Sequence, residues 1–186
     1  MKTQKIVCTG GPSVGKTSVI NHLLEQGFIC FLEIIRTLTD ALSPEEKSSH
    51  SQSNPIVMAN NSMQFNNSIL EGRLMHYNEA TALKETVAFF DRGMPDVLAY
   101  MQFFDQSIPQ AFTEVCKENK YDQVFVFPPW AEIYKKDAQR FESFEEAVAI
   151  HHALVKTYTS LGYVPITVPK DTIANRANFI VKQLNS

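Results

Sequence analysis

The chain has 186 residues, a length that fits one domain, 1–186, with a core of its own. Its net charge of -3, with 44% hydrophobic and 20% charged residues, is ordinary for a globular protein. The absence of a Lys/Arg-rich block argues against a nucleic-acid partner. The absence of an apolar run near the ~18 residues of a membrane span argues against a membrane partner. The three cysteines are scattered and form no Cys-x-x-Cys pair, so we expect reduced thiols and a cytoplasmic protein.

The N-terminal part predicts a strand, a glycine-rich loop, a helix and a second strand, in that order. An apolar run at 5–10 stops at glycine and predicts a buried strand. Residues 16–27 have the spacing of an amphipathic helix that ends at a glycine. A second apolar run, 28–33, predicts another buried strand that ends at Glu33.

The central part begins with a polar stretch. Residues 40–54 are rich in serine and predict a mobile loop. Pro55 is expected to open a helix that runs to about Thr81, and an apolar strand follows at 86–91. Beyond it the elements alternate, with helices expected at 95–104, 109–119, 143–162 and 172–184, and strands at 123–129 and 164–169. A charged connection, 130–140, follows the fourth strand.

This alternation predicts the fold class. Every predicted strand is an unbroken apolar run, which is typical of a parallel sheet that helices cover on both faces. The sequence therefore predicts a three-layer α/β fold. In such sheets ligands bind beyond the carboxyl ends of the strands, so functional residues are expected immediately after the strands.

The loop after the first strand carries the clearest motif, because GGPSVGKTS at 10–18 contains the pattern G-x-x-x-x-G-K-[ST]. Its glycines allow tight turns in which backbone N–H groups point at phosphates. Lys16 is expected to reach the β- and γ-phosphates, and Thr17 to offer its hydroxyl to Mg²⁺. We expect ATP here, with GTP as the alternative. The predicted nucleotide-binding residues are Gly10, Gly11, Pro12, Ser13, Val14, Gly15, Lys16, Thr17 and Ser18.

Charged residues follow two further strands. Asp91 ends the apolar strand at 86–91 and is expected to support Mg²⁺, while the neighbouring Arg92 can fork onto a phosphate or an acceptor group. Glu33 ends the second strand, where a carboxylate can take the proton of a substrate hydroxyl, and Arg36 follows it by one helical turn. We interpret Glu33, Arg36 and Arg92 as substrate-side residues. An ordinary solvated strand end is the alternative for Glu33.

The connection after the fourth strand is basic. We expect residues 129–142 to form a lid in which Arg140 neutralises charge on the transferring group. Lys135 and Lys136 lie in the same segment, and a solvated charged helix is the alternative for both.

One motif is misleading. NKYD at 119–122 matches the guanine-reading N-K-x-D pattern of GTPases, in which it follows a buried strand. Here a predicted helix precedes it and a strand follows, so the motif is expected at the edge of the sheet opposite the ligand. The sequence also contains no D-x-x-G switch motif.

The motifs together resemble a P-loop domain family that includes the NadR-type nicotinamide riboside kinase domain and eukaryotic GTP-binding relatives linked to channel trafficking. The segments that carry the resemblance are GGPSVGKTSVI, EIIR, FDRGMPDVLAY, YDQVFVFPPWAEIYKKDAQRFESFEEA and LGYVPITVP. The resemblance covers nearly the whole chain and is weakest over 37–80. It implies a P-loop NTPase fold with a five-stranded parallel sheet of the nucleoside and nucleotide kinase type. It also implies ATP and Mg²⁺ at 10–18, an acceptor side with Glu33 and Asp91–Arg92, and Arg140 in the lid.

We therefore expect a kinase that transfers the γ-phosphate of ATP to a hydroxyl of a small metabolite, with a nucleoside-like acceptor such as nicotinamide riboside as one example. Lys16, Glu33, Asp91, Arg92 and Arg140 are the expected catalytic residues, and Thr17 and Asp91 the expected metal ligands. The segment 37–80 is expected to hold the acceptor. The alternative is a GTP- or ATP-dependent switch that binds a partner without kinase activity. A chaperone-like oligomeric ATPase is a weaker third reading.

Overall fold

The computed structural model describes residues 2–35, 62–134 and 142–184. The described residues form a five-stranded parallel sheet in the order β2-β3-β1-β4-β5. The strands are β1 (Gln4–Gly10), β2 (Ile29–Phe31), β3 (Val87–Asp91), β4 (Gln123–Phe127) and β5 (Ile166–Thr167). Because β1 lies in the middle, the loop that follows it emerges at the centre of the carboxyl edge of the sheet.

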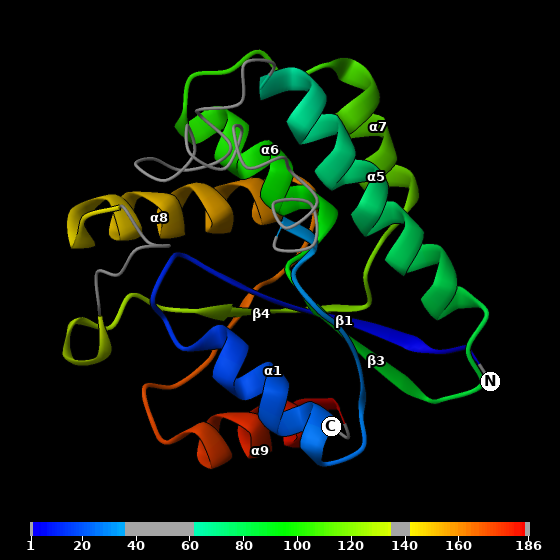
Figure 1. The fold of residues 1–186 in the computed structure, drawn as a ribbon, viewed down its shortest axis with the longest axis vertical. Helices are drawn as coiled ribbons and strands as arrows, with labels where there is room; N and C mark the ends of the chain where they lie inside the picture. The colour runs from blue at the N-terminus through cyan, green and yellow to red at the C-terminus, as the bar shows by residue number, and fades with distance from the viewer. Residues whose placement is uncertain (1, 36–61, 135–141, 185–186) are drawn as a thin grey trace, which may run out of the picture.

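Helices cover both faces of this sheet, so the predicted three-layer α/β fold is confirmed (Figure 1). One face carries α1 (Lys16–Glu25) and α9 (Ile173–Leu184). The other carries α5 (Ser62–Thr81), α6 (Met94–Phe103), α7 (Gln110–Glu118) and α8 (Phe144–Ser160). A short 3-10 helix, η1 (Ala131–Ile133), follows β4.

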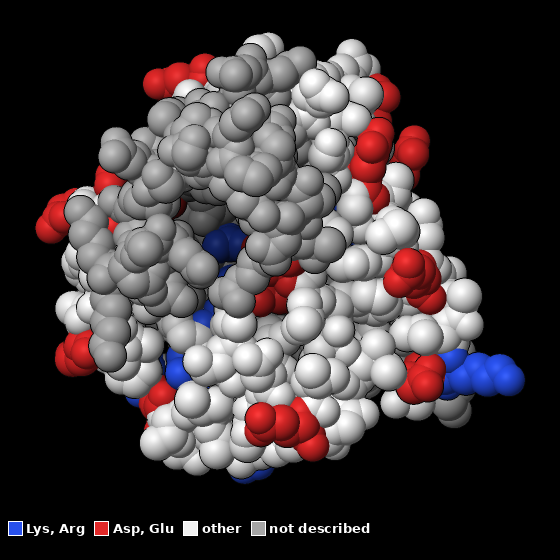
Figure 2. Space-filling view, viewed as in Figure 1, with Lys and Arg blue, Asp and Glu red and all other residues white. Residues whose placement is uncertain are grey.

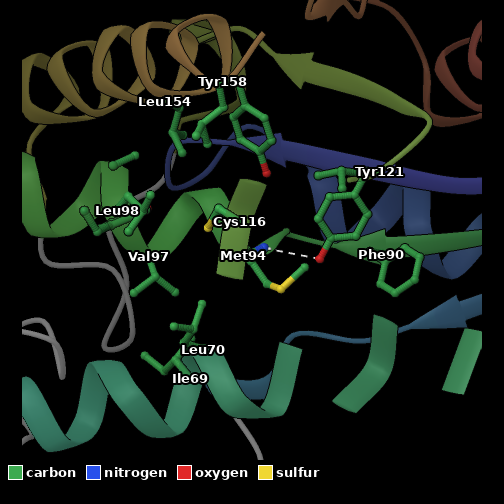
Figure 3. Close-up of a cluster of buried hydrophobic side chains, with 14 of the residues drawn as sticks. Ile69, Leu70, Phe90, Met94, Val97, Leu98, Cys116, Tyr121, Leu154 and Tyr158 are labelled. Carbon is green, nitrogen blue, oxygen red and sulfur yellow. Dashed lines mark hydrogen bonds between the residues drawn. The ribbon is translucent and has the colours of Figure 1, made fainter. Parts of the chain in front are cut away.

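The alternation of side chains along the strands divides the core into two clusters. Val7 and Phe90 pack against the helices on the α5–α8 face, whereas Ile6 and Phe89 pack against α1 and α9. Figure 3 shows the larger cluster, with residues from α5, α6 and α8 converging on the end of β3. There the Tyr121 hydroxyl accepts a hydrogen bond from the backbone N–H of Met94 at 3.3 Å, which ties the start of α6 to the segment before β4.

Most predicted elements are present, but the two edge strands are shorter than expected. The 28–33 strand is limited to Ile29–Phe31, and the 164–169 strand to Ile166–Thr167. An edge strand pairs on one side only, so its apolar run extends further than its hydrogen-bonded ladder. The helix predicted over 55–81 is described from Ser62 onward. The predicted loop at 40–54 lies outside the described residues.

Two composition-based expectations can be compared with the structure. Cys8, Cys30 and Cys116 are free thiols; Cys8 and Cys116 are buried, and Cys30 is half-buried. Among the described residues, no helix combines the length and the apolarity that crossing a bilayer requires.

Candidate active site

The loop between β1 and α1 has the backbone of a phosphate cradle. Gly15 adopts a left-handed φ of +76°, which a residue with a Cβ rarely adopts, and it directly precedes α1. A Cβ on Gly10 would lie 2.8 Å from the carbonyl oxygen of Phe127, so only glycine fits against β4 there. The first turn of α1 begins at Lys16, so its free N–H groups face the same space.

Lys16, Thr17 and Asp91 meet beside this loop. The Nζ of Lys16 lies 2.8 Å from Oδ1 of Asp91, and both side chains are more than nine-tenths buried. The Thr17 hydroxyl lies 3.5 Å from the other carboxylate oxygen of Asp91. Register explains the contact, because Asp91 at the end of β3 pairs with Cys8 near the end of β1. The predicted donor-side residues therefore share one corner of the site.

Glu33 lies two residues beyond β2, with both carboxylate oxygens held by arginines. Its Oε2 is 2.6 Å from Nε of Arg92, and its Oε1 is 3.0 Å from Nη2 of Arg73. Arg73 also donates from Nη1 to the carbonyl oxygen of Gly93 at 3.0 Å. The alternative that Glu33 is an ordinary solvated strand end is therefore wrong, because its carboxylate is 12% exposed and paired with two arginines.

Arg73 reaches this network because of the spacing of residues on α5. Asn66, Ile69, Leu70 and Arg73 follow one another at intervals of three, one and three, and all four are buried. This buried face includes an arginine, and α5 therefore carries a cation to the carboxylate of Glu33. Sequence reasoning missed Arg73, because a single arginine inside a long predicted helix gives no local signal.

Asp96 is the second residue that the sequence did not reveal, and it is fully buried. Its Oδ1 accepts hydrogen bonds from the Thr9 hydroxyl at 2.7 Å and from Nη1 of Arg92 at 3.1 Å. Its Oδ2 accepts from the Tyr158 hydroxyl at 2.5 Å and from the N–H of Gly93 at 3.1 Å. The aspartate in "DRGMPD" was a possible signal, since it occupies the third position of α6, where its carboxylate accepts a hydrogen bond from the N–H of the N-cap residue Gly93.

The pKa of Asp96 shows how this network is balanced. Burial alone would raise the pKa of this carboxyl group. The guanidinium groups of Arg92 and Arg73, together with the hydrogen bonds from Thr9 and Tyr158, outweigh burial and hold the pKa below its ordinary value. Asp96 is therefore a carboxylate in the folded protein at neutral pH and balances part of the arginine charge.

Arg92 connects the ion-pair network of Glu33 and Asp96 to the phosphate loop. Besides Glu33 and Asp96, it donates from Nη1 to the carbonyl oxygen of Gly10 at 3.1 Å, and its guanidinium lies 5.2 Å from the centre of the Tyr100 ring. Its backbone φ is +77°, a strained conformation for a residue other than glycine. Such strain persists where surrounding contacts over-determine a residue, and the ion pairs of Arg92 supply those contacts.

The structure thus brings together Lys16, Thr17, Glu33, Asp91 and Arg92 and adds Arg73 and Asp96 to them. Arg36, Lys135, Lys136 and Arg140 lie outside the described residues, as does half of the predicted lid, 135–141. In Figure 2, a few basic side chains are visible near the centre of this face, whereas its outer part carries mainly acidic groups.

The NKYD motif lies at the other end of the sheet, as expected. The side chain of Asn119 donates to the carbonyl oxygen of Val115 at 2.9 Å and so helps to end α7. The carboxylate of Asp122 accepts from the N–H of Lys5, near the start of β1, at 2.8 Å. Both roles are structural, and the motif is remote from the phosphate loop, which follows the carboxyl end of β1.

A family profile described as an AAA domain matches residues 5–176. None of the curated proteins matches the sequence at a significant level. Solved structures with the same fold include deoxyadenosine kinase from M. mycoides with bound dATP, with a TM-score of 0.69 and 14% identity over 98% of this chain and 100% of that chain. Thymidylate kinase from Candida albicans has a TM-score of 0.65 and 13% identity, over 99% of this chain and 92% of that one.

A NadR protein in complex with NR has a TM-score of 0.70 and 14% identity over 98% of this chain. The match spans 50% of the NadR chain, so this chain corresponds to about half of that protein. At this level of identity the likeness establishes the fold, and the predicted five-stranded parallel sheet of the nucleoside and nucleotide kinase type is confirmed.

Proposed function

The chain belongs to the AAA domain family, and from this premise we propose that it is a P-loop kinase that transfers the γ-phosphate of ATP to a hydroxyl group of a small, nucleoside-like acceptor. One observation carries the proposal. Arg92 contacts Glu33 at 2.6 Å and the carbonyl oxygen of Gly10 at 3.1 Å, so one guanidinium joins an acceptor-side carboxylate to the phosphate loop. A protein that only binds a nucleotide has no need for a largely buried carboxylate, 12% exposed, that two arginines fix at this position.

The donor half consists of the loop, Lys16 and the corner at Asp91. The backbone N–H groups of 10–18 would bind the phosphates, and Lys16 would exchange Asp91 for phosphate oxygens. Thr17 and Asp91 offer a hydroxyl and a carboxylate oxygen 3.5 Å apart. This set fits Mg²⁺, which proteins usually bind through one or two oxygens in addition to phosphates and water. When bound, the ion would neutralise charge on the β- and γ-phosphates.

The acceptor half depends on Glu33. A carboxylate offers about four acceptor sites, so the two arginines leave room for a hydrogen bond from a substrate hydroxyl. In the reaction the acceptor oxygen forms a bond to the γ-phosphorus and the bond to the β-phosphate oxygen breaks, which releases ADP. The hydroxyl proton passes to Glu33. Arg73 and Arg92 hold the carboxylate in one orientation, which is the main requirement for such a transfer.

Charge favours a hydroxyl over a phosphate as the acceptor group. Among the described residues, the two acceptor-side cations, Arg73 and Arg92, are paired with Glu33 and Asp96. A phosphomonoester at the same place would meet the carboxylate of Glu33 and be repelled. Deoxyadenosine kinase and NadR, whose structures resemble this chain, carry nucleoside-related names and ligands, which supports a nucleoside-like acceptor.

Glu33→Gln tests the mechanism. The amide keeps the shape of the side chain but cannot take the proton, so kcat for acceptor phosphorylation should fall by about 10²- to 10⁴-fold. The affinity for ATP should stay within a factor of about two, because Glu33 does not contact the donor. Steady-state kinetics and isothermal titration give the two quantities. Glu118→Gln, the same change at an exposed position of α7, is the control.

Two results would contradict the proposed kinase activity. One is a Glu33→Gln variant with unchanged turnover. The other is a wild-type protein that binds a triphosphate but phosphorylates no member of a nucleoside panel, which would favour the nucleotide-dependent switch.

A further inference from the structure

Arg176, in the first turn of α9, has no part in the proposed reaction and yet reaches the phosphate loop. Its side chain is only 5% exposed. Its Nη1 donates to the carbonyl oxygen of Val14 at 3.0 Å. The guanidinium also packs directly against Gly15, since a Cβ on Gly15 would lie 2.9 Å from Nη1 of Arg176.

The contact with Val14 has a geometric consequence for phosphate binding. In a trans peptide the C=O and the following N–H point in opposite directions. By holding the Val14 carbonyl behind the loop, Arg176 turns the N–H of Gly15 toward the cradle. The loop binds phosphates through such N–H groups, so this hydrogen bond fixes one of its donors.

The guanidinium also lies against the end of β4. It is 5.9 Å from the centre of the Phe127 ring and 5.5 Å from that of Trp130. Arg176 thus joins three segments that are distant in sequence: the phosphate loop, the residues after β4 and α9. Trp130 is the single tryptophan of the chain, so its fluorescence reports on this contact.

The charge of Arg176 is poorly compensated. In the described part of the chain, no carboxylate lies within salt-bridge distance of it, and its Nε is buried without a hydrogen-bond partner. Burial lowers the pKa of this group, with only the exposed Asp171 acting in the opposite direction. A buried cation without a counter-charge is unfavourable in the ligand-free protein. A polyphosphate in the neighbouring loop would supply the missing negative charge.

We propose that Arg176 is a positioning residue for the donor nucleotide: it orients the Gly15 N–H, and the triphosphate compensates its buried charge. The inference rests on triphosphate binding by the loop, as the proposed function does. It goes further because it assigns part of the affinity for the donor nucleotide to a residue far from the loop motif. It also predicts that Arg176 contributes to the affinity for MgATP and little to the melting temperature of the nucleotide-free protein.

The experiment measures melting temperature and affinity for MgATP in Arg176→Met and Arg176→Lys. Removing the hydrogen bond and the charge should weaken MgATP binding by about tenfold or more, the scale of a hydrogen bond to a charged group. Lysine, which keeps the charge but not the planar fork, should restore part of the affinity. Without nucleotide, both variants should have melting temperatures close to that of the wild type. Methionine removes the uncompensated buried charge, and the flexible lysine side chain can carry it toward solvent, so in each case the lost hydrogen bond is offset.

Trp130 emission provides a second readout. MgATP should change it in the wild type at the concentration that saturates binding, and only at higher concentration in Arg176→Met. In activity assays the KM for ATP should rise while the KM for the acceptor stays unchanged. Lys117→Met, which removes an exposed cation of α7, is the matched control for net charge.

The outcomes separate this inference from the proposed function. If both variants bind MgATP as the wild type does, or if both melt much lower without nucleotide and bind normally once folded, Arg176 is a structural residue and the inference is wrong. If the variants bind MgATP weakly as expected but the wild type, which binds MgATP, phosphorylates no acceptor, the kinase proposal fails and the inference stands. A wild-type protein that does not bind MgATP overturns both.

Discussion

Among single residues, Asp96 is the one whose charge the site depends on most directly. It is fully buried and accepts four hydrogen bonds, two of them from side chains of uncharged residues and one from Arg92. Removing one member of a buried charge pair is strongly destabilising, because the remaining charge is left without a partner. The stability of the fold and the position of Arg92 are therefore linked through this carboxylate.

Asp96→Asn should lower stability at neutral pH by about 3–5 kcal/mol, the usual effect of breaking a buried pair. The folded pKa of Asp96 lies below the unfolded value of about 3.9, so the unfolded state binds its proton first as pH falls. The stabilisation is complete above the unfolded pKa and is lost as pH drops through the folded pKa. The difference between wild type and variant should therefore begin to shrink as the pH falls below about 4.

Urea unfolding at several pH values measures this difference. Asp105→Asn, an exposed change that keeps a residue tolerant of the left-handed φ of +50° at this position, is the control. A difference between wild type and Asp96→Asn that stays constant down to pH 2 would show that Asp96 is not the charged group of the network.

Among the elements, α8 supports the site from both of its ends. Near its start, the carbonyl oxygen of Ala147 packs so closely against the phosphate loop that a Cβ on Gly11 would lie 2.9 Å from it. Near its end, Tyr158 donates to Asp96 at 2.5 Å. A capping box begins the helix: the Ser143 hydroxyl accepts from the N–H of Glu146 at 3.1 Å, and the Glu146 carboxylate accepts from the N–H of Ser143 at 2.6 Å.

Ser143→Ala should therefore lower the free energy of unfolding by about 1 kcal/mol, the usual value for an N-cap. For a chain of this size the melting temperature should fall by about 2–4 °C. Differential scanning calorimetry measures both. Ser68→Ala on α5 is the control, because alanine is the better helix former at a position inside a helix. An equal response of the two variants would show that the cap does not hold α8.

At the scale of the whole molecule, the order and type of the elements could be predicted because their local signals agree. The apolar runs of β1, β3 and β4, the glycine stops of α1 and α8, and the cap at Ser143 all act within a few residues. The donor half of the site could be predicted for the same reason, since 10–18 is one contiguous motif.

The acceptor half could be predicted only in part, because its contacts join distant segments. Arg73 meets Glu33 across 40 residues, and Asp96 meets Thr9 across 87. Glu33 and Arg92 were identified from their positions after strands. Their partners come from helix faces, where an arginine or an aspartate has the same local pattern whether it is solvated or buried.

The order β2-β3-β1-β4-β5 places the phosphate loop between the acceptor-side residues after β2 and β3 and the residues after β4. This arrangement supports the central proposal, that the γ-phosphate of a bound triphosphate passes to the hydroxyl of an uncharged acceptor and the diphosphate is released. Phosphoryl transfer from radiolabelled ATP to a panel of nucleosides and to their 5′-monophosphates, in parallel and with the products identified by ³¹P NMR, tests it most directly. We predict that nucleosides are converted to phosphomonoesters while the monophosphates react far more slowly. Phosphorylation of the monophosphates alone, or of neither class by a protein that binds ATP, would contradict the account.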